Sequence, residues 1–334
     1  MDQFTVPSGE PATLTDSAAV LDAEVNRLLQ QAVERANSRV MVVEKLGSRW
    51  IEPGCNETRL YDALVGHLAR SMIGQMESFA EADAQVARRR VLFEQSIYHD
   101  FDWPSSPTLV LTGRMAAVIR LAGVEMGTDK LGHFFTEGYS YFLVTEQLQK
   151  SVDSALLFGE WSEAVYFGAQ TTGVFSYADL TANFQGLRFW NKVLADQLDP
   201  LTHRQSTPYI QCKDERWVQT QSFRWQDYVD SGWSEAVNCP VVRSEILLQR
   251  VPRSLVHCRN EQLPYKRYGA WQARLLNPHG WHVLPDQLQP EKILQRRVER
   301  FDLNLSADTL QYLGELRVRL EAWREEQSGT AAQP

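Results

Sequence analysis

The stretch at residues 127–142, GTDKLGHFFTEGYSYF, combines acidic, basic and aromatic side chains and decides how the rest of the chain is interpreted. Asp129, His133 and Glu137 follow one another at a spacing of four residues. On an α-helix this spacing turns each successive side chain by only about 40°. The pattern therefore predicts one helix that carries a polar stripe of these three side chains.

Two residues mark the expected ends of this helix. Thr128 is a favourable N-cap, so we expect the helix to begin at Asp129. Gly138 is typical of a residue that ends a helix. Because Phe134 and Phe135 flank the stripe, we expect it to face a cleft rather than open solvent.

This arrangement is compatible with acid–base chemistry. A glutamate at a helix end among apolar groups has a raised pKa and can donate a proton to a leaving oxygen, a role that we assign to Glu137. Asp129 lies near the positive end of the helix, where ionisation is favoured, and His133 can bond to either carboxyl. The alternative is structural: Asp129 complements the helix dipole, and His133 with Glu137 is an ordinary (i, i+4) pair.

A second informative stretch is TTGVFSYADLTANFQGLRFW at residues 171–190. Ser176 and Asp179 have the S-x-x-D spacing of a capping box. Asn183 follows Asp179 by four residues, so both should face the same way. Gly173 indicates a tight turn, and Gly186 indicates a close approach of another element.

The two stretches together resemble the lysozyme-like muramidase and transglycosylase superfamily. In that family the acid glutamate ends a helix, and a later segment similar to GVFSYADLTAN lines the cleft. The resemblance covers about 65 of the 334 residues. It implies hydrolysis of peptidoglycan glycan strands without a cofactor, with Glu137 as the acid. The expected substrate-binding residues are Tyr139, Thr172, Tyr177, Asp179 and Asn183.

Two other interpretations use the same residues. Asp129, His133 and Glu137, with Asp179, could form a mixed nitrogen and oxygen metal site. The outer pair of the stripe is about 12 Å apart along a helix axis, which disfavours this site, so no metal is expected. The stripe could also be a buried structural network in a non-catalytic bacterial envelope or interaction protein.

Composition excludes several classes of protein. Hydrophobic residues make up 43% of the chain, which is enough for a sizeable core. The net charge of -8 gives no basic face for nucleic acid. No run of about 18 uncharged apolar residues occurs, so no transmembrane segment is expected. The polar N-terminus shows no signal peptide.

The four cysteines leave two alternatives open. Cys55, Cys212, Cys239 and Cys258 have no zinc-binding spacing. They predict either two disulfides, with a bridge among the last three, or four buried reduced thiols. The first alternative places the protein in the periplasm or outside the cell.

Patterning along the chain predicts a mainly α-helical fold with a lysozyme-like body and an irregular C-terminal half that disulfides could tie. We expect a disordered N-terminus at 1–15, a helical body with the site at 16–199, and an irregular segment with a C-terminal helix packed on the body at 200–325, followed by a tail at 326–334. Within the body, we expect helices at 17–37, at 57–76 with Asn56 as its N-cap, and at 81–95, and a mostly helical region at 128–194. The apolar run at 108–123 could be a buried strand or a helix. Aromatic-rich residues 222–239 supply Asp227, Asp230 and Glu235 as a possible second carboxylate, although a clamp over the body is the favoured role. The residues expected to face inward are Leu21, Val25, Leu28, Ala32, Ala36, Leu60, Leu64, Leu68 and Met72.

Overall fold

The computed structural model describes most of the chain from residue 14 to residue 251, and it is mainly helical, as the sequence predicts. The expected C-terminal helix at 307–326, the tail, and nearly all of the N-terminal segment lie outside the described residues. These are 14–251 without 39, 45–46, 52–53, 71–73, 147, 150–151 and 166–167, together with 268.

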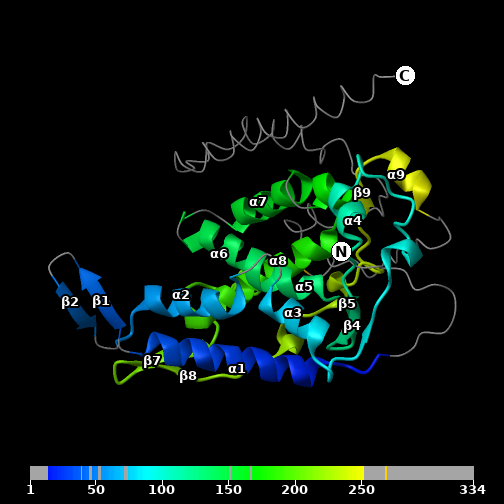
Figure 1. The fold of residues 1–334 in the computed structure, drawn as a ribbon. Coiled ribbons are helices and arrows are strands. Elements are labelled where there is room, and N and C mark those ends of the chain that lie inside the picture. Colours follow the sequence, from blue (N-terminus) through cyan, green and yellow to red (C-terminus); the bar gives the residue numbers. More distant parts are fainter. Residues whose placement is uncertain are drawn as a thin grey trace.

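Helix α8 (Tyr177–Leu194) runs through the helical body, and nearly all of its side chains are buried. Figure 1 shows α6 (Gly138–Glu146) and α7 (Val152–Val165) on one side of it. On the other side lie α2 (Glu57–Leu68) and α1 (Ala18–Ala36). Helix α8, which carries Asp179 and Asn183, is therefore almost completely buried.

Helices α1 and α2 confirm the amphipathic patterns of the sequence, but α2 ends at Leu68 and does not continue to residue 76 as predicted. Every residue expected to face inward on them is buried, while Met72 lies outside the described residues. The side chain of Asn56 accepts a hydrogen bond from the Arg59 amide at 2.9 Å and so caps α2 as predicted. Between them, strands β1 (Val40–Glu44) and β2 (Gly47–Ile51) form an antiparallel hairpin.

The predicted helix at 81–95 is wrong. Helix α3 (Gln75–Ala82) ends at Asp83, which is extended and whose side chain accepts a hydrogen bond from the Gln85 amide. The Arg88 guanidinium then donates to three backbone carbonyls, which fixes the turn. The chain continues as β3 (Arg88–Arg89) and the 3-10 helix Phe93–Gln95.

A three-stranded antiparallel sheet leads into the decisive stretch. Strand β4 (Val118–Leu121) pairs with β3 and with β5 (Val124–Gly127). The apolar run at 108–123, for which the sequence did not decide between strand and helix, contains both: most of helix α4 (Pro107–Thr112) and all of strand β4. Strand β5 ends next to α5 (Asp129–Gly132), so the sheet delivers Asp129 to its place.

The predicted helix ends around the stripe need two corrections. The helix does begin at Asp129, but Thr128 does not cap it, because its hydroxyl instead donates to Glu81 Oε1 at 2.5 Å. Gly138 does not end it either: α5 continues through a π-helical turn (His133–Glu137) into α6, and Gly138 has helical angles. A Cβ on Gly138 would lie 2.5 Å from the Cα of Gly186 in α8. Gly138 is therefore required for helix packing rather than for a helix end.

The chain after α8 is irregular, as predicted, and follows the surface of the helical body. Strands β7 (Ile210–Lys213) and β8 (Arg216–Gln219) form a hairpin beside α1 (Figure 1). Two 3-10 helices follow, Trp225–Asp227 and Ser231–Trp233. Strand β9 (Val241–Val242) then pairs with β6 (Val174–Phe175). Helix α9 (Glu245–Arg250) follows it and is the last element named among the described residues.

A disulfide joins Cys55, just before α2, to Cys212 in β7. The structure therefore contains disulfides rather than reduced thiols, but Cys212 pairs with Cys55 and not with Cys239 or Cys258. Cys239 is disulfide-bonded too, and Cys258 lies outside the described residues. No helix within the described ranges is long and apolar enough to cross a membrane. The disulfide is consistent with an extracytoplasmic location.

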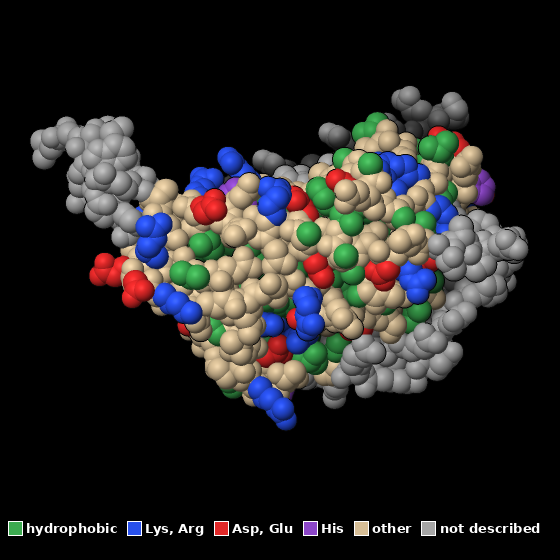
Figure 2. All heavy atoms as spheres, turned by 90° about the horizontal axis from the view of Figure 1, so that it is seen from below, with side chains coloured by type: hydrophobic (Ala, Val, Ile, Leu, Met, Phe, Trp, Pro, Cys, Tyr) green, Lys and Arg blue, Asp and Glu red, His purple; other side chains and the backbone are tan. Residues whose placement is uncertain are grey.

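Aromatic side chains fill the core between the helices and the irregular segment. The ring of Phe134 lies 5.0 Å from Trp225 and 5.7 Å from Trp233, measured between centroids. Both Trp side chains are fully buried. On the face shown in Figure 2, basic and acidic side chains are interspersed.

Candidate functional site

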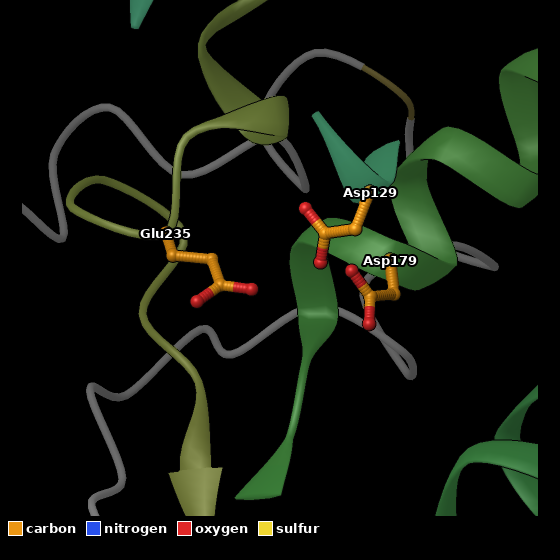
Figure 3. A group of neighbouring side chains, drawn as sticks. All are labelled: Asp129, Asp179 and Glu235. Carbon is orange, nitrogen blue, oxygen red and sulfur yellow. The ribbon is translucent and has the colours of Figure 1, made fainter. Parts of the chain in front are cut away.

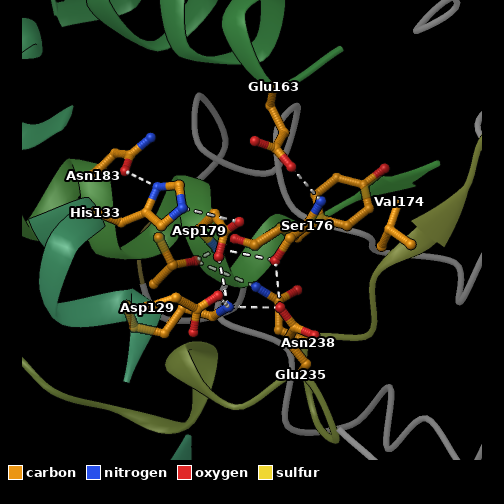
Figure 4. A network of polar contacts seen from close by, with 12 residues as sticks. Asp129, His133, Glu163, Val174, Ser176, Asp179, Asn183, Glu235 and Asn238 are labelled. Carbon is orange, nitrogen blue, oxygen red and sulfur yellow. Dashed lines mark hydrogen bonds and ion pairs between the residues drawn. The ribbon is translucent and has the colours of Figure 1, made fainter. Parts of the chain in front are cut away.

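Lys130 is the centre of a buried ionic cluster. Its side chain is 0% exposed, and its Nζ lies 2.6 Å from Asp179 Oδ1 and 2.6 Å from Glu235 Oε1. The distance from Nζ to Asp129 Oδ2 is 3.0 Å. Three carboxylates, from α5, from the first turn of α8 and from the irregular segment, therefore surround one ammonium group. Figure 3 shows these three carboxylates, and Figure 4 shows the polar contacts around them.

Burial and the neighbouring positive charges act in opposite directions on the pKa values of these carboxyls. Burial by itself would raise the pKa of Asp179, but the positive charges of His133 and Lys130 outweigh it and lower that pKa. Burial likewise acts to raise the pKa of Asp129, and Lys130 is the largest neighbouring charge that lowers it. Both carboxyls are therefore ionised, and Lys130 is the cation that compensates them.

His133 bridges the buried cluster and the more open side of the site. Its Nε2 lies 3.2 Å from Asp179 Oδ2, and its Nδ1 lies 3.0 Å from Asn183 Oδ1. Its side chain is 20% exposed. The prediction that Asp179 and Asn183 face the same way is confirmed, because both meet one imidazole (Figure 4).

Glu137 lies in the π-helical turn, partly exposed, and its pKa is raised. Burial is the main cause, the charge of Asp179 adds to it, and His133 opposes it. The predicted directions, downward for Asp129 and upward for Glu137, are confirmed. The predicted causes are only partly right, because Glu137 is in the middle of a continuous helix and not at a negative helix end.

A second layer of polar contacts holds the cluster. Ser176 Oγ donates to Glu235 Oε1 at 2.9 Å and accepts from the Asp179 amide at 3.2 Å, so the predicted cap is present. The Ser176 amide donates to Glu163 Oε1 at 2.9 Å. Burial, with the charge of Asp179, raises the pKa of Glu163 well above its usual range. Glu163 therefore favours its neutral form.

Three predicted substrate-binding residues lie elsewhere in the fold. Tyr177 is fully buried in the core, so it lines no surface. The hydroxyl of Thr172 donates to the Gly168 carbonyl at 2.9 Å and so serves the local backbone. Tyr139 packs against Trp190, with ring centroids 4.7 Å apart and ring planes tilted by 57°. Of the predicted set, the structure gathers Asp129, His133, Asp179 and Asn183, with Glu137 beside them.

Sequence analysis missed two central residues. Lys130 was overlooked although it is the one lysine in GTDKLGHFF, and a lysine between an acid and an apolar run is the pattern that could have identified it. Glu163 has no comparable local pattern. Glu235 was considered as a second carboxylate, and the structure places it in the cluster.

The carboxylate oxygens of Asp129, Asp179 and Glu235 lie within 4.8 Å of one another, close enough to share a cation. Lys130 Nζ lies among these oxygens and is within ion-pair distance of all three residues. A divalent metal at this place would have to displace a side chain that is fully enclosed. The donor set therefore fits the lysine ammonium better than it fits a metal ion.

No family model matches the chain, and neither a curated protein nor a solved structure is significantly similar to it. What can be said about function therefore rests on the residues of the site and on their geometry.

Proposed function

We propose that this protein is a glycoside hydrolase in which Glu137 is the general acid. One arrangement carries the proposal: Asp179 lies 3.2 Å from His133, and Glu137 follows His133 by one turn of the same helix. Burial raises the pKa of Glu137, whereas the neighbouring charges lower the pKa of Asp179. Carboxyl pairs whose environments separate their pKa values are the pattern expected of assigned acid and base roles.

Each residue has a definite role in this mechanism. Glu137 is partly exposed and holds the proton that the leaving sugar oxygen receives. Asp179 stays ionised and, with Asn183, orients the His133 ring. Lys130 and its other two carboxylates keep Asp179 in place. Asp129 is then a positioning residue and not a proton donor.

Peptidoglycan glycan strands are the substrate that we propose, because the motifs resemble those of lysozyme-like enzymes. A periplasmic or secreted location follows from this substrate, and the Cys55–Cys212 disulfide is consistent with it. The substrate rests on the resemblance, whereas the acid–base role rests on the geometry.

The decisive measurement is the release of soluble fragments from purified sacculi. Glu137→Gln keeps the shape of the side chain but cannot deliver a proton, so we expect activity to fall by about 10²-fold or more. The melting temperature should change little. Glu34→Gln makes the same chemical change on an exposed face of α1 and should keep full activity. Full activity of Glu137→Gln would refute the assignment.

A second candidate is favoured by the complete burial of Lys130. In this case the cluster is a structural network in a non-catalytic envelope or interaction protein. The wild-type protein would then release nothing from sacculi, although it is folded.

Chelator treatment separates both candidates from a metal enzyme: we expect activity and stability to be unchanged, and elemental analysis to find no stoichiometric metal.

A further inference from the structure

A separate pocket of about 240 Å³ lies between α2 and the ends of α6 and α8. Its aromatic lining comes from Tyr61, Tyr139 and Phe142. The Tyr61 and Phe142 rings stack with centroids 5.1 Å apart and planes 24° apart, and Tyr139 and Phe142 stack at 6.0 Å and 25°. Phe142 is buried and the two tyrosines are half-buried, so the rings form the inner wall.

The outer part of this pocket is acidic. Glu57, Asp62 and Asp196 are exposed and Glu146 is half-buried. No lysine or arginine is found among the described residues that line the pocket. Burial raises the pKa of Tyr61, and the negative charges of Asp196, Glu146 and Glu57 raise it further. The tyrosine ring therefore lies in a negative field that these carboxylates create.

A buried acceptor completes the lining. Asn191 is only 8% exposed, and its Oδ1 has no hydrogen-bond partner among the described residues. A buried amide oxygen without a donor costs free energy, unless something that enters the pocket supplies one. This observation is independent of the acidic rim, and it indicates a ligand with a polar or positive group.

We propose that this pocket binds the alkylammonium group of a small organic cation. The faces of aromatic rings attract ammonium groups, and a site partly removed from water strengthens this attraction. The carboxylates supply the charge, and the Asn191 amide offers an acceptor to a donor on the ligand. A divalent metal fits less well, because aromatic rings occupy the positions where it would need oxygen ligands. The proposal does not depend on the hydrolase activity.

Choline is the probe for this test, and its neutral isostere 3,3-dimethylbutan-1-ol is the matched control. Saturation-transfer NMR at constant ionic strength should give a dissociation constant for choline on the order of 1 mM or lower, as expected for a ligand of this size. The neutral isostere should bind at least tenfold more weakly. Equal binding of the two probes, or no saturable binding of choline, would overturn the proposal.

Variants locate the binding. Asp62→Asn combined with Glu146→Gln should weaken choline binding about tenfold, and Tyr139→Leu should weaken it as much, since charge and ring face both contribute. Glu34→Gln removes one negative charge elsewhere and should leave the affinity unchanged. If Glu34→Gln weakens binding as much as the pocket variants do, the attraction comes from net charge and the pocket is not the site. Circular dichroism checks that each variant is folded.

Discussion

At the scale of single residues, the buried Lys130 dominates the energetics of the site. An ammonium group taken out of water is costly, and only close carboxylates compensate it. Here three carboxylates lie within 3.0 Å of Nζ. Removing one charged side chain from such a cluster leaves its buried partners less well compensated. Such a substitution should therefore lower the free energy of unfolding strongly.

Lys130→Met should lower the free energy of unfolding by about 3–5 kcal/mol at neutral pH. In this variant Asp129, Asp179 and Glu235 lose the ammonium group that lies within 3.0 Å of each of them, so their folded-state pKa values should rise relative to those of the wild-type protein. The loss should therefore shrink as the pH falls and the carboxyls take up protons. Urea unfolding between pH 4 and pH 8 measures this. Lys213→Met, at an exposed position, should change stability by no more than about 0.5 kcal/mol.

Glu163→Gln tests the opposite situation, a buried acid with a raised pKa. The contribution of such a group to stability is present below its unfolded pKa and is lost as the pH rises through its folded pKa. Glutamine is never ionised and still accepts from the Ser176 amide. The variant should thus be more stable than wild type at pH 8 and equal to it near pH 4. Each unit by which folding raises the pKa of Glu163 corresponds to about 1.4 kcal/mol of this difference. An unchanged pH dependence would contradict the raised pKa.

At the scale of elements, the contact between α6 and α8 fixes the site. Gly138 and Gly186 let the two helix backbones approach closely, and a Cβ on Gly186 would collide with the Phe134 carbonyl oxygen. The close approach places Asp179 and Asn183 of α8 against His133. The side chains of the candidate site are in this way positioned by two glycines, which have no side chain of their own.

Gly186→Ala should destabilise the protein by about 1–3 kcal/mol or more, because the new methyl group has no room. The matched control is Gly66→Ala in α2. The nearest atom to its Cβ, apart from adjacent groups, would be Arg35 Nη1 at 3.7 Å, an ordinary contact. Since alanine has the higher helix propensity, Gly66→Ala should instead stabilise by about 0.5–1 kcal/mol. Thermal unfolding of both variants gives the two signs directly.

The contact between Gly138 and Gly186 also shows which features could be predicted from the sequence and which could not. Asn56 and Ser176 were predicted correctly as caps, and so were the inward faces of α1 and α2, because each depends on residues within a turn or two. Gly138 was misinterpreted because its role depends on Gly186, 48 positions later in the chain. Glu235 and Lys130 meet only after the irregular segment has folded back, and no local pattern records that meeting.

At the scale of the whole molecule, the Cys55–Cys212 disulfide connects the start of α2 to the segment after α8. It spans 157 residues and so encloses every helix that carries the site. A cross-link that closes a long loop lowers the entropy of the unfolded chain more than one that closes a short loop. The bridge therefore acts on the helical body as a unit, without touching Lys130 or Glu137.

Replacing both cysteines, as Cys55→Ser with Cys212→Ser, should lower the free energy of unfolding by about 2–5 kcal/mol. Because the bridge mainly constrains the unfolded chain, the folded variant should release fragments from sacculi as the wild-type protein does, below its melting transition. Urea unfolding under non-reducing conditions measures the loss, and peptide mass spectrometry of the wild type checks the pairing. Protein isolated from its native compartment should contain the bridge. If it contains free thiols at both positions, the extracytoplasmic location is wrong, and the stability that the bridge supplies is absent from the working protein.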